Sequence, residues 1–164
     1  MKKIFILIFT FSINLIYSKE IQVNLLELYK ELHANPELSY QEYETSKKLA
    51  SLLESIGYQV TRNVGGNGVV ALLENGDGNT VMFRADMDGL PVEEKTGASY
   101  ASKNRVKNLD GEEVFTMHAF GHDLHMTVLI GVAEYLYKIK DTWQGKLLLV
   151  LEPAEEVSGG ARNM

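Results

Sequence analysis

Two aspartates in residues 84–91 are spaced so that they could do chemistry together. Asp86 and Asp88 follow an apolar run and are two positions apart, so the alternation of an extended chain places both carboxylates on the same side. Carboxylates held in this way could bind a cation or transfer protons. The alternative is a pair of turn-forming aspartates before Gly89.

Three of the four histidines lie within residues 118–125, where His118, His122 and His125 surround Asp123. If Asp123 begins a helix, its carboxylate favours the positive N-terminal end, and the nearby imidazoles could converge on a cation. A single histidine is more often structural, but this density beside a carboxylate favours a metal or catalytic role. The spacing matches neither a zinc finger nor a His-Glu-x-x-His pattern, so it names no metal.

The third polar segment contains three glutamates in residues 152–156 and follows an apolar run. The neighbouring carboxylates Glu155 and Glu156 repel each other, and one is driven toward its neutral form unless a cation compensates. This arrangement suits a division of labour in which one glutamate binds a metal and the other handles protons. The alternative is a solvated acidic turn.

Apolar spacing indicates the elements that must position these segments. Helix-type periodicity predicts helices over residues 21–32, 39–56 and 123–139. Apolar runs predict strands over residues 58–60, 68–73, 80–84 and 146–151. Helices that alternate with strands predict an α/β fold, a mixed β-sheet flanked by helices, with the polar segments at the ends of its strands.

Local signals make further predictions about the connections. Ser39, followed three residues later by Glu42, predicts a capping box at the start of the second helix, and Gly57 predicts its end. The turn residues 75–79 predict a hairpin that pairs the strands on either side of them. Residues 93–113 form a polar excursion, which at that length is expected to be functional or internally structured.

The N-terminus and the composition narrow the function classes. Lys2 and Lys3 precede an apolar run over residues 4–16 and then Ser18, which predicts a signal peptide over residues 1–18 and export to the periplasm or the medium. That run is too short for a stable membrane span. The net charge of −6, with no basic stripe, argues against nucleic acid as a partner. With no cysteine, packing or metal ions must hold the domain.

Four stretches, taken in order, resemble one family. They are Leu-His-Ala-Asn-Pro-Glu-Leu-Ser at 32–39, Arg-Ala-Asp-Met-Asp-Gly-Leu-Pro at 84–91, His-Ala-Phe-Gly-His-Asp at 118–123 and Pro-Ala-Glu-Glu at 153–156. Together they resemble the metal-dependent N-acyl-amino-acid amidohydrolases. That group includes hippurate hydrolases and auxin-conjugate hydrolases, within the aminoacylase and carboxypeptidase class of co-catalytic metallopeptidases.

The resemblance implies a role for each matching residue. His122 and Glu156 would be metal ligands, Glu155 the general base that activates the attacking water, and Asp88 the acid that orients a metal-binding neighbour. The implied cofactors are two divalent ions, zinc, manganese or cobalt. The implied substrate is an N-acyl amino acid or a similar peptide-like small molecule.

The sequence departs from the family at one position and in its length. Phe120 stands where the family has a cysteine ligand, and a phenyl ring offers a cation no lone pair, so weaker metal binding is expected. Further histidine ligands and a dimerisation domain lie downstream in the family. Residues 19–164 are therefore expected to form the N-terminal part of the catalytic domain, and a homodimer only in a longer form.

Two other hypotheses stay open at this point. One is a non-catalytic remnant, or a binding protein that has lost the metal site. The other is a small metal-binding module that uses His118, His122 and His125.

Overall fold

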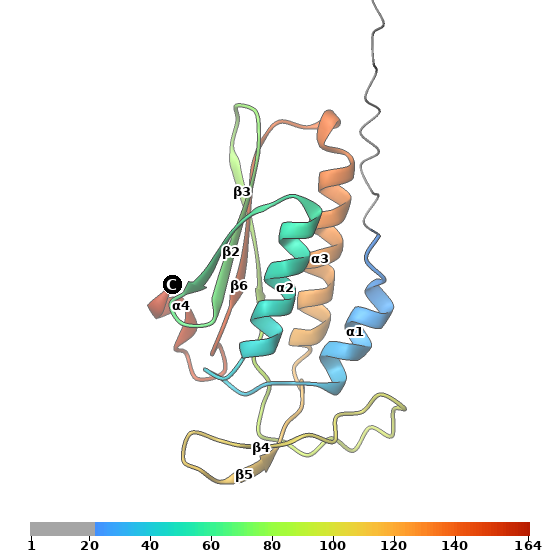
Figure 1. Cartoon of the computed structure of the whole chain (residues 1–164), viewed down its shortest axis with the longest axis vertical. Helices are drawn as coiled ribbons and strands as arrows, with labels where there is room; N and C mark the ends of the chain where they lie inside the picture. The colour runs from blue at the N-terminus through green and yellow to red at the C-terminus, as the bar shows by residue number, and fades with distance from the viewer. Residues whose placement is uncertain (1–21) are drawn as a thin grey trace, which may run out of the picture.

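The computed structural model describes residues 22–164 (Figure 1). The predicted signal peptide, residues 1–18, lies outside the described residues. The helices are α1 (Leu25–Ala34), α2 (Tyr43–Ile56), α3 (His122–Lys138) and the short α4 (Gly160–Asn163). The strands are β1 (Gln59–Val64), β2 (Gly68–Asn75), β3 (Thr80–Asp86), β4 (Arg105–Lys107), β5 (Glu113–Phe115) and β6 (Gly145–Glu152).

Strand β6 lies inside a four-stranded mixed sheet of order β1-β2-β6-β3. It pairs antiparallel with β2 and parallel with β3. It therefore has a hydrogen-bonded strand on each side, and the side chains Leu147, Leu149 and Leu151 of its apolar run are buried. A strand with such a run is expected at the interior of a sheet rather than at its edge. The predicted mixed α/β architecture is therefore confirmed.

The predicted hairpin across residues 75–79 is wrong. β2 and β3 run in opposite directions, but β6 is inserted between them, and both pair with β6 instead of with each other. The connection passes over the start of β6, where Lys146 N donates to Asn79 O at 3.0 Å. A Cβ atom on Gly145 would lie 2.6 Å from Asn79 O, so the crossing requires glycine there. Turn residues signal a reversal of the chain, but not the strand that fills the gap.

The three long helices lie on one side of the sheet (Figure 1). Helices α2 and α3 contact the strands, and α1 packs against α3. Gly57, with φ of 120°, ends α2 as predicted. The core between these layers is apolar and fully buried, as shown by Leu49, Leu53, Met126, Ile130, Leu149 and Leu151. None of the helices in residues 22–164 combines the length and the apolar character that a bilayer crossing requires.

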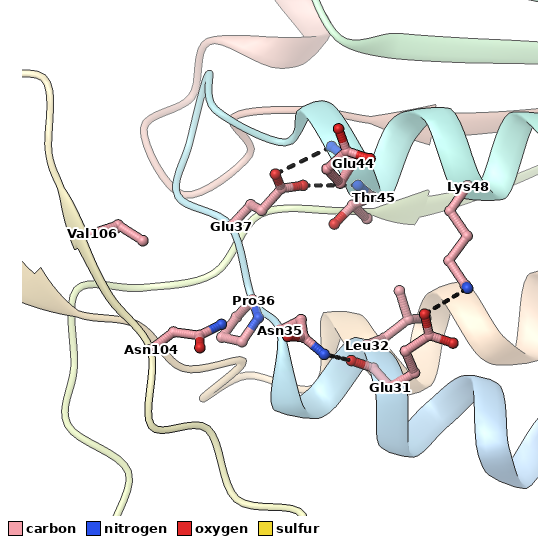
Figure 2. Close-up of a pocket in the computed structure, with 10 residues that line it drawn as sticks. All are labelled: Glu31, Leu32, Asn35, Pro36, Glu37, Glu44, Thr45, Lys48, Asn104 and Val106. Atoms are coloured by element: carbon pink, nitrogen blue, oxygen red, sulfur yellow. Dashed lines mark hydrogen bonds and ion pairs between the residues drawn. The ribbon is translucent and has the colours of Figure 1, made fainter.

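The predicted capping box at the start of α2 is also wrong. The helix begins at Tyr43, and its first free amides, those of Glu44 and Thr45, donate to the Glu37 carboxylate at 3.1 and 2.8 Å (Figure 2). Glu37 lies beside a surface cavity of about 450 Å³, whose lining includes none of the predicted site residues. The side chains of Ser39 and Glu42 instead form hydrogen bonds with the polar segments: Ser39 donates to Asp88, and Glu42 accepts from Ala154.

The polar segments meet because parallel strands end at the same edge of a sheet. Asp86 of β3 is paired with Glu152 of β6, so residues 86–91 and 153–156 leave the sheet side by side. Helix α3 begins at His122 beside the same edge. The excursion over residues 93–113 contains β4 and leads into β5, and these two strands form a small separate ribbon. The excursion is thus internally structured.

Shortening a buried side chain at the centre of the sheet tests this description of the core. Leu149 is fully buried between β2 and β3, so Leu149→Ala is expected to lower the free energy of unfolding by about 2–5 kcal/mol. Leu26→Ala removes the same atoms from a residue that is 60 % exposed and is expected to change it by less than about 0.5 kcal/mol. Urea denaturation followed by circular dichroism measures both; equal losses would contradict the placement of β6.

Candidate metal centre

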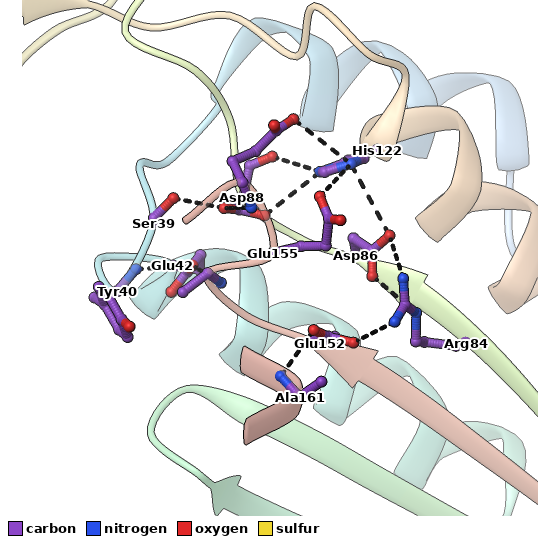
Figure 3. Close-up of polar contacts among 12 residues, drawn as sticks. Ser39, Tyr40, Glu42, Arg84, Asp86, Asp88, His122, Glu152, Glu155 and Ala161 are labelled. Carbon is purple, nitrogen blue, oxygen red and sulfur yellow. Dashed lines mark hydrogen bonds and ion pairs between the residues drawn. The ribbon is translucent and has the colours of Figure 1, made fainter. Parts of the chain in front are cut away.

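Four carboxylates lie within 4.0 Å of the His122 imidazole, and Figure 3 labels three of them, Asp86, Asp88 and Glu155. His122 Nε2 lies 4.0 Å from Asp86 Oδ2 and 3.8 Å from both Glu155 Oε2 and Glu156 Oε1. His122 Nδ1 lies 3.5 Å from Asp88 Oδ1. Asp86, His122 and Glu155 each offer one ligand atom, and these atoms all lie within 4.8 Å of one another. The four residues predicted for the site therefore lie together, and Asp86 joins them.

The hydrogen bond of His122 determines which ring nitrogen faces the carboxylates. Nδ1 donates to the backbone oxygen of Asp88 at 2.8 Å, so in the neutral ring Nε2 carries the free lone pair. Nε2 is the atom that faces Asp86, Glu155 and Glu156. The ring is therefore held in the tautomer and orientation that a metal ligand requires.

The same neighbours favour a proton on His122 when no cation is bound. Hydrogen bonding to Asp88 raises the pKa of His122 to about 9, although burial acts in the opposite direction. The charge of Asp86 adds to the rise. At neutral pH the imidazolium thus supplies part of the positive charge that the cluster needs.

Asp88 is held rigidly beneath this imidazole. Its Oδ2 accepts from Ser39 Oγ at 2.6 Å and from the backbone N–H of Glu156 at 3.1 Å. Burial alone would raise the pKa of Asp88, but the nearby His122 imidazole and the hydrogen bond from Ser39 outweigh it and hold that pKa below its usual range. Its Oδ1 is buried and faces His122 Nδ1 at 3.5 Å, without a well-formed hydrogen bond. Asp88 therefore remains an anion that links three segments of the chain.

Glu156 has a different environment from Asp88. Burial raises the pKa of its carboxyl, the nearby His122 lowers it, and the charges of Asp88 and Glu155 raise it again. The net shift is upward, as expected for one of several carboxylates that share a site without enough positive charge. A divalent cation would compensate the excess of negative charge in this cluster.

Asp86 is held from the side of the sheet. Arg84 Nε lies 3.1 Å from Asp86 Oδ1, and Arg84 Nη1 lies 2.8 Å from the buried carboxylate of Glu152. The alternation of residues 84–88 did indicate that Asp86 and Asp88 share a side, but the resemblance assigned a role to Asp88 alone. The structure brings Asp86 into the same cluster, as the spacing of the two aspartates indicated and the resemblance did not.

The start of α3 is fixed by a buried histidine in α1. His33 Nδ1 contacts Asp123 Oδ2 at 2.6 Å, and His33 Nε2 contacts Glu94 Oε1 at 3.0 Å. Burial alone would lower the pKa of His33, but the hydrogen bonds to Glu94 and Asp123 outweigh it and raise the pKa. One imidazolium thus ties α1 and the 93–113 excursion to the residue that follows His122.

The three predicted histidines do not converge. His118 is buried, and neither ring nitrogen has a hydrogen-bond partner; burial lowers its pKa to about 4. His125 is exposed, and its ring centroid lies 6.0 Å from that of His122. Among the three, only His122 joins the ligand group that residues 22–164 form, which argues against a module built on the histidines.

The cluster fits a divalent cation. Carboxylate oxygens and an imidazole nitrogen suit zinc, manganese and cobalt alike. The carboxylates around His122 outnumber its single positive charge, and Oδ1 of Asp88 has no well-formed hydrogen bond, so both observations point to a missing positive charge. Phe120 is 71 % exposed, so its ring projects into solvent and leaves the space among the carboxylates free, but it supplies no ligand.

Comparisons with known proteins identify the family and agree with the fold. Residues 82–164 match Peptidase family M20/M25/M40. The chain is 43 % identical over 150 residues to thermostable carboxypeptidase 2 of Saccharolobus solfataricus, covering 89 % of this chain and 36 % of that protein. It is 37 % identical over 142 residues to the N-acetyl-L-cysteine deacetylase of Bacillus subtilis, covering 86 % of this chain and 32 % of that one.

The fold resembles a solved metal-binding peptidase. The Bacillus subtilis YXEP protein, described as a dinuclear metal binding peptidase from the M20 family, matches with a TM-score of 0.74 at 36 % identity, over 85 % of this chain and 37 % of that one. This chain therefore belongs to Peptidase family M20/M25/M40. It spans about a third of the length of the curated relatives that it matches.

The raised pKa of His122 gives a test of the cluster without metal. We expect His122 in the metal-free protein to titrate at about 9 rather than at its ordinary 6.5, and its pKa to fall in Asp88→Asn. Because the folded pKa lies above the unfolded one, this histidine's stabilisation is complete below pH 6.5 and is lost as the pH rises through about 9. Imidazole NMR signals report the titration, with the exposed Asp77→Asn as control.

A His122 pKa near 6.5 in the metal-free wild type would show that the carboxylates do not surround the ring as described. An equal fall in Asp88→Asn and Asp77→Asn would show a general charge effect instead of the specific contact.

Proposed function

We propose that this protein is a metal-dependent hydrolase that cleaves the amide bond of N-acyl amino acids or related peptide-like molecules. The observation that carries the proposal is the cluster around His122 Nε2 at the carboxyl edge of the sheet, where a carboxylate oxygen of Asp86 lies at 4.0 Å and those of Glu155 and Glu156 lie at 3.8 Å. Membership of Peptidase family M20/M25/M40 supports it. Zinc, manganese or cobalt is the proposed cofactor, with two ions per site.

Each site residue has a task in this proposal. His122, through Nε2, and Glu156 hold metal, with Asp86 as a further ligand. Bound divalent ions would polarise the scissile carbonyl and acidify water. Glu155, whose side chain is 37 % exposed, is open to water and substrate, and its carboxylate takes the proton of the attacking water. Asp88 orients His122.

The substrate class rests on the relatives. One relative is named for deacetylation of N-acetyl-L-cysteine and another as a carboxypeptidase. Both reactions hydrolyse an amide next to an amino acid, so we extend that class to this protein. Export, residues 19–164 as the N-terminal part of a catalytic domain, and a homodimer in a longer form are further parts of the proposal.

A second candidate function rests on Phe120. This residue stands where the family resemblance implies a thiolate ligand, so the chain could retain the fold as a binding protein with little metal chemistry. The acidic cluster around His122 favours the hydrolase, because four carboxylates are costly to keep together without a cation.

Replacing the proposed general base tests the hydrolase directly. Glu155→Gln removes the proton acceptor and keeps the shape, so kcat for hippurate or N-acetyl amino acids is expected to fall by about 10²- to 10⁴-fold while metal content is retained. Release of the free amino acid is followed with zinc, manganese or cobalt supplied, in the 164-residue chain and in the native gene product. The exposed Glu93→Gln is the control. If the native product with metal hydrolyses none of these substrates, the proposal is wrong.

Restoring a thiolate distinguishes the two candidate functions. Phe120→Cys is expected to tighten Co²⁺ binding by about tenfold or more and to add a thiolate-to-cobalt absorption band, because the new ligand is anionic and soft. Phe120→Ser removes the ring and adds no comparable ligand, so it serves as the control. An unchanged affinity in Phe120→Cys would mean that the remaining ligands do not form a site beside residue 120.

A further inference from the structure

Glu42 is a fully buried carboxylate that takes no part in the proposed metal centre. It stands at the N-cap position of α2, where its side chain makes no capping bond, and its exposed fraction is 0 %. Burying a carboxylate is costly unless donors replace the lost water. The hydrogen bonds that replace the lost water therefore indicate the structural role of Glu42.

Three donors surround the Glu42 carboxylate, and they come from three segments. Oε1 accepts the backbone N–H of Ala154 at 2.7 Å and that of Tyr40 at 2.9 Å. Oε2 accepts the amide of Asn67 at 2.9 Å. Figure 3 shows Glu42 between Tyr40 and the segment that leads to Glu155. Glu42 thus joins the loop before α2, the turn before β2 and the loop after β6.

Two of these partners have backbones in the left-handed region. Tyr40 has φ of 67° and Ala154 has φ of 50°, conformations that side chains other than glycine seldom adopt. Such conformations persist where surrounding contacts over-determine them. Glu42 supplies that contact for both residues from a single oxygen.

Both backbone polar groups of Ala154 form hydrogen bonds. Its N–H donates to Glu42, and its carbonyl oxygen accepts from Gly159 N at 3.0 Å and Gly160 N at 3.3 Å. The Tyr40 hydroxyl packs so closely on this loop that a Cβ on Gly159 would lie 1.8 Å from it. The loop after β6 is thus closed on itself and fastened to the segment before α2.

Glu155 lies between two fastened amides. Glu42 holds the amide of Ala154 before it, and Asp88 holds the amide of Glu156 after it at 3.1 Å. The backbone of Glu155 has little freedom between these two points. These two points fix where the Glu155 side chain leaves the backbone, and its Oε2 lies 3.8 Å from His122 Nε2.

We propose that Glu42 is a positioning residue: it holds Ala154 in its left-handed conformation and thereby aims Glu155 and Glu156 at the metal centre. This inference rests on the proposed function of those two glutamates. Glu42 itself contacts none of the ligand atoms around His122 in the described structure. Outer partners of this kind set ligand orientation, and their loss costs about 10- to 100-fold in metal affinity.

The test compares three variants of the metal-free and Co²⁺-loaded chain. Glu42→Ala removes the acceptor, Glu42→Gln keeps one oxygen for the two backbone amides, and Glu44→Ala removes the same groups from a neighbouring side chain that is 80 % exposed. Hydrogen exchange of the Ala154, Glu155 and Glu156 amides reports the loop, and cobalt titration reports the metal centre. Thermal unfolding is recorded for each variant.

We expect Glu42→Ala to exchange at Ala154 about tenfold faster or more, because the amide loses its acceptor, and to bind Co²⁺ about 10- to 100-fold more weakly. Glu42→Gln should restore both values to within a fewfold of wild type, and Glu44→Ala should change neither. If Glu42→Ala does not fold, Glu42→Asp replaces it: this variant keeps the charge and withdraws the carboxylate by one methylene, so it should still accelerate exchange at Ala154.

Three results would count against this role. Unchanged exchange at Ala154 would overturn it, as would faster exchange with undiminished cobalt affinity, or equal effects of Glu42→Ala and Glu44→Ala. If the wild type binds no cobalt, the proposed function fails by itself. Exchange then decides the positioning role: acceleration confined to residues 154–156 supports it, and acceleration spread over the whole chain overturns it.

Discussion

Like-charge repulsion at the carboxyl edge of the sheet is the constraint on which the rest of the structure depends. Asp86, Asp88, Glu155 and Glu156 lie around one imidazole, and in solution these groups would separate. The raised pKa values of His122 and Glu156 are two signs of the same shortage of positive charge. A cluster of this kind persists only if the backbone that carries it is held by other means.

Those other means are mostly hydrogen bonds to the backbone and pairing in the sheet. The parallel register of β3 and β6 places residue 86 opposite residue 152. Buried carboxylates then fix the loops beyond the strands: Asp88 accepts the amide of Glu156, and Glu42 accepts the amide of Ala154. The site is thus assembled from acidic groups of two kinds, those that face the centre and those that hold the loops.

The position of α3 completes this arrangement. His122 is the first residue of the helix, and the next residue, Asp123, is bonded to His33 of α1. The backbone position of His122 is therefore fixed, as well as the tautomer of its ring. Phe120, two residues earlier, projects into solvent, so its ring does not fill the space among the carboxylates.

Much of the fold was predictable from local patterns. Apolar periodicity placed α2, α3 and β6 to within a few residues, and the family resemblance singled out Asp88, His122, Glu155 and Glu156, which lie together in the structure. Such patterns arise from one face or one run of the chain, so they are visible without knowledge of the rest. The alternation after β3 also indicated that Asp86 and Asp88 share a side.

The errors all concern partners that are distant in the sequence. The hairpin prediction failed because β6, some 65 residues further along, enters between β2 and β3. The capping-box prediction failed because Ser39 and Glu42 bond to Asp88 and Ala154 rather than to each other's backbone.

The sequence by itself determined which residues could bind a cation and which runs would form helices and strands, because these are properties of local side chains. Only the tertiary structure decided which strand fills the sheet and which buried carboxylates hold the loops, since both depend on contacts between segments that no local pattern connects.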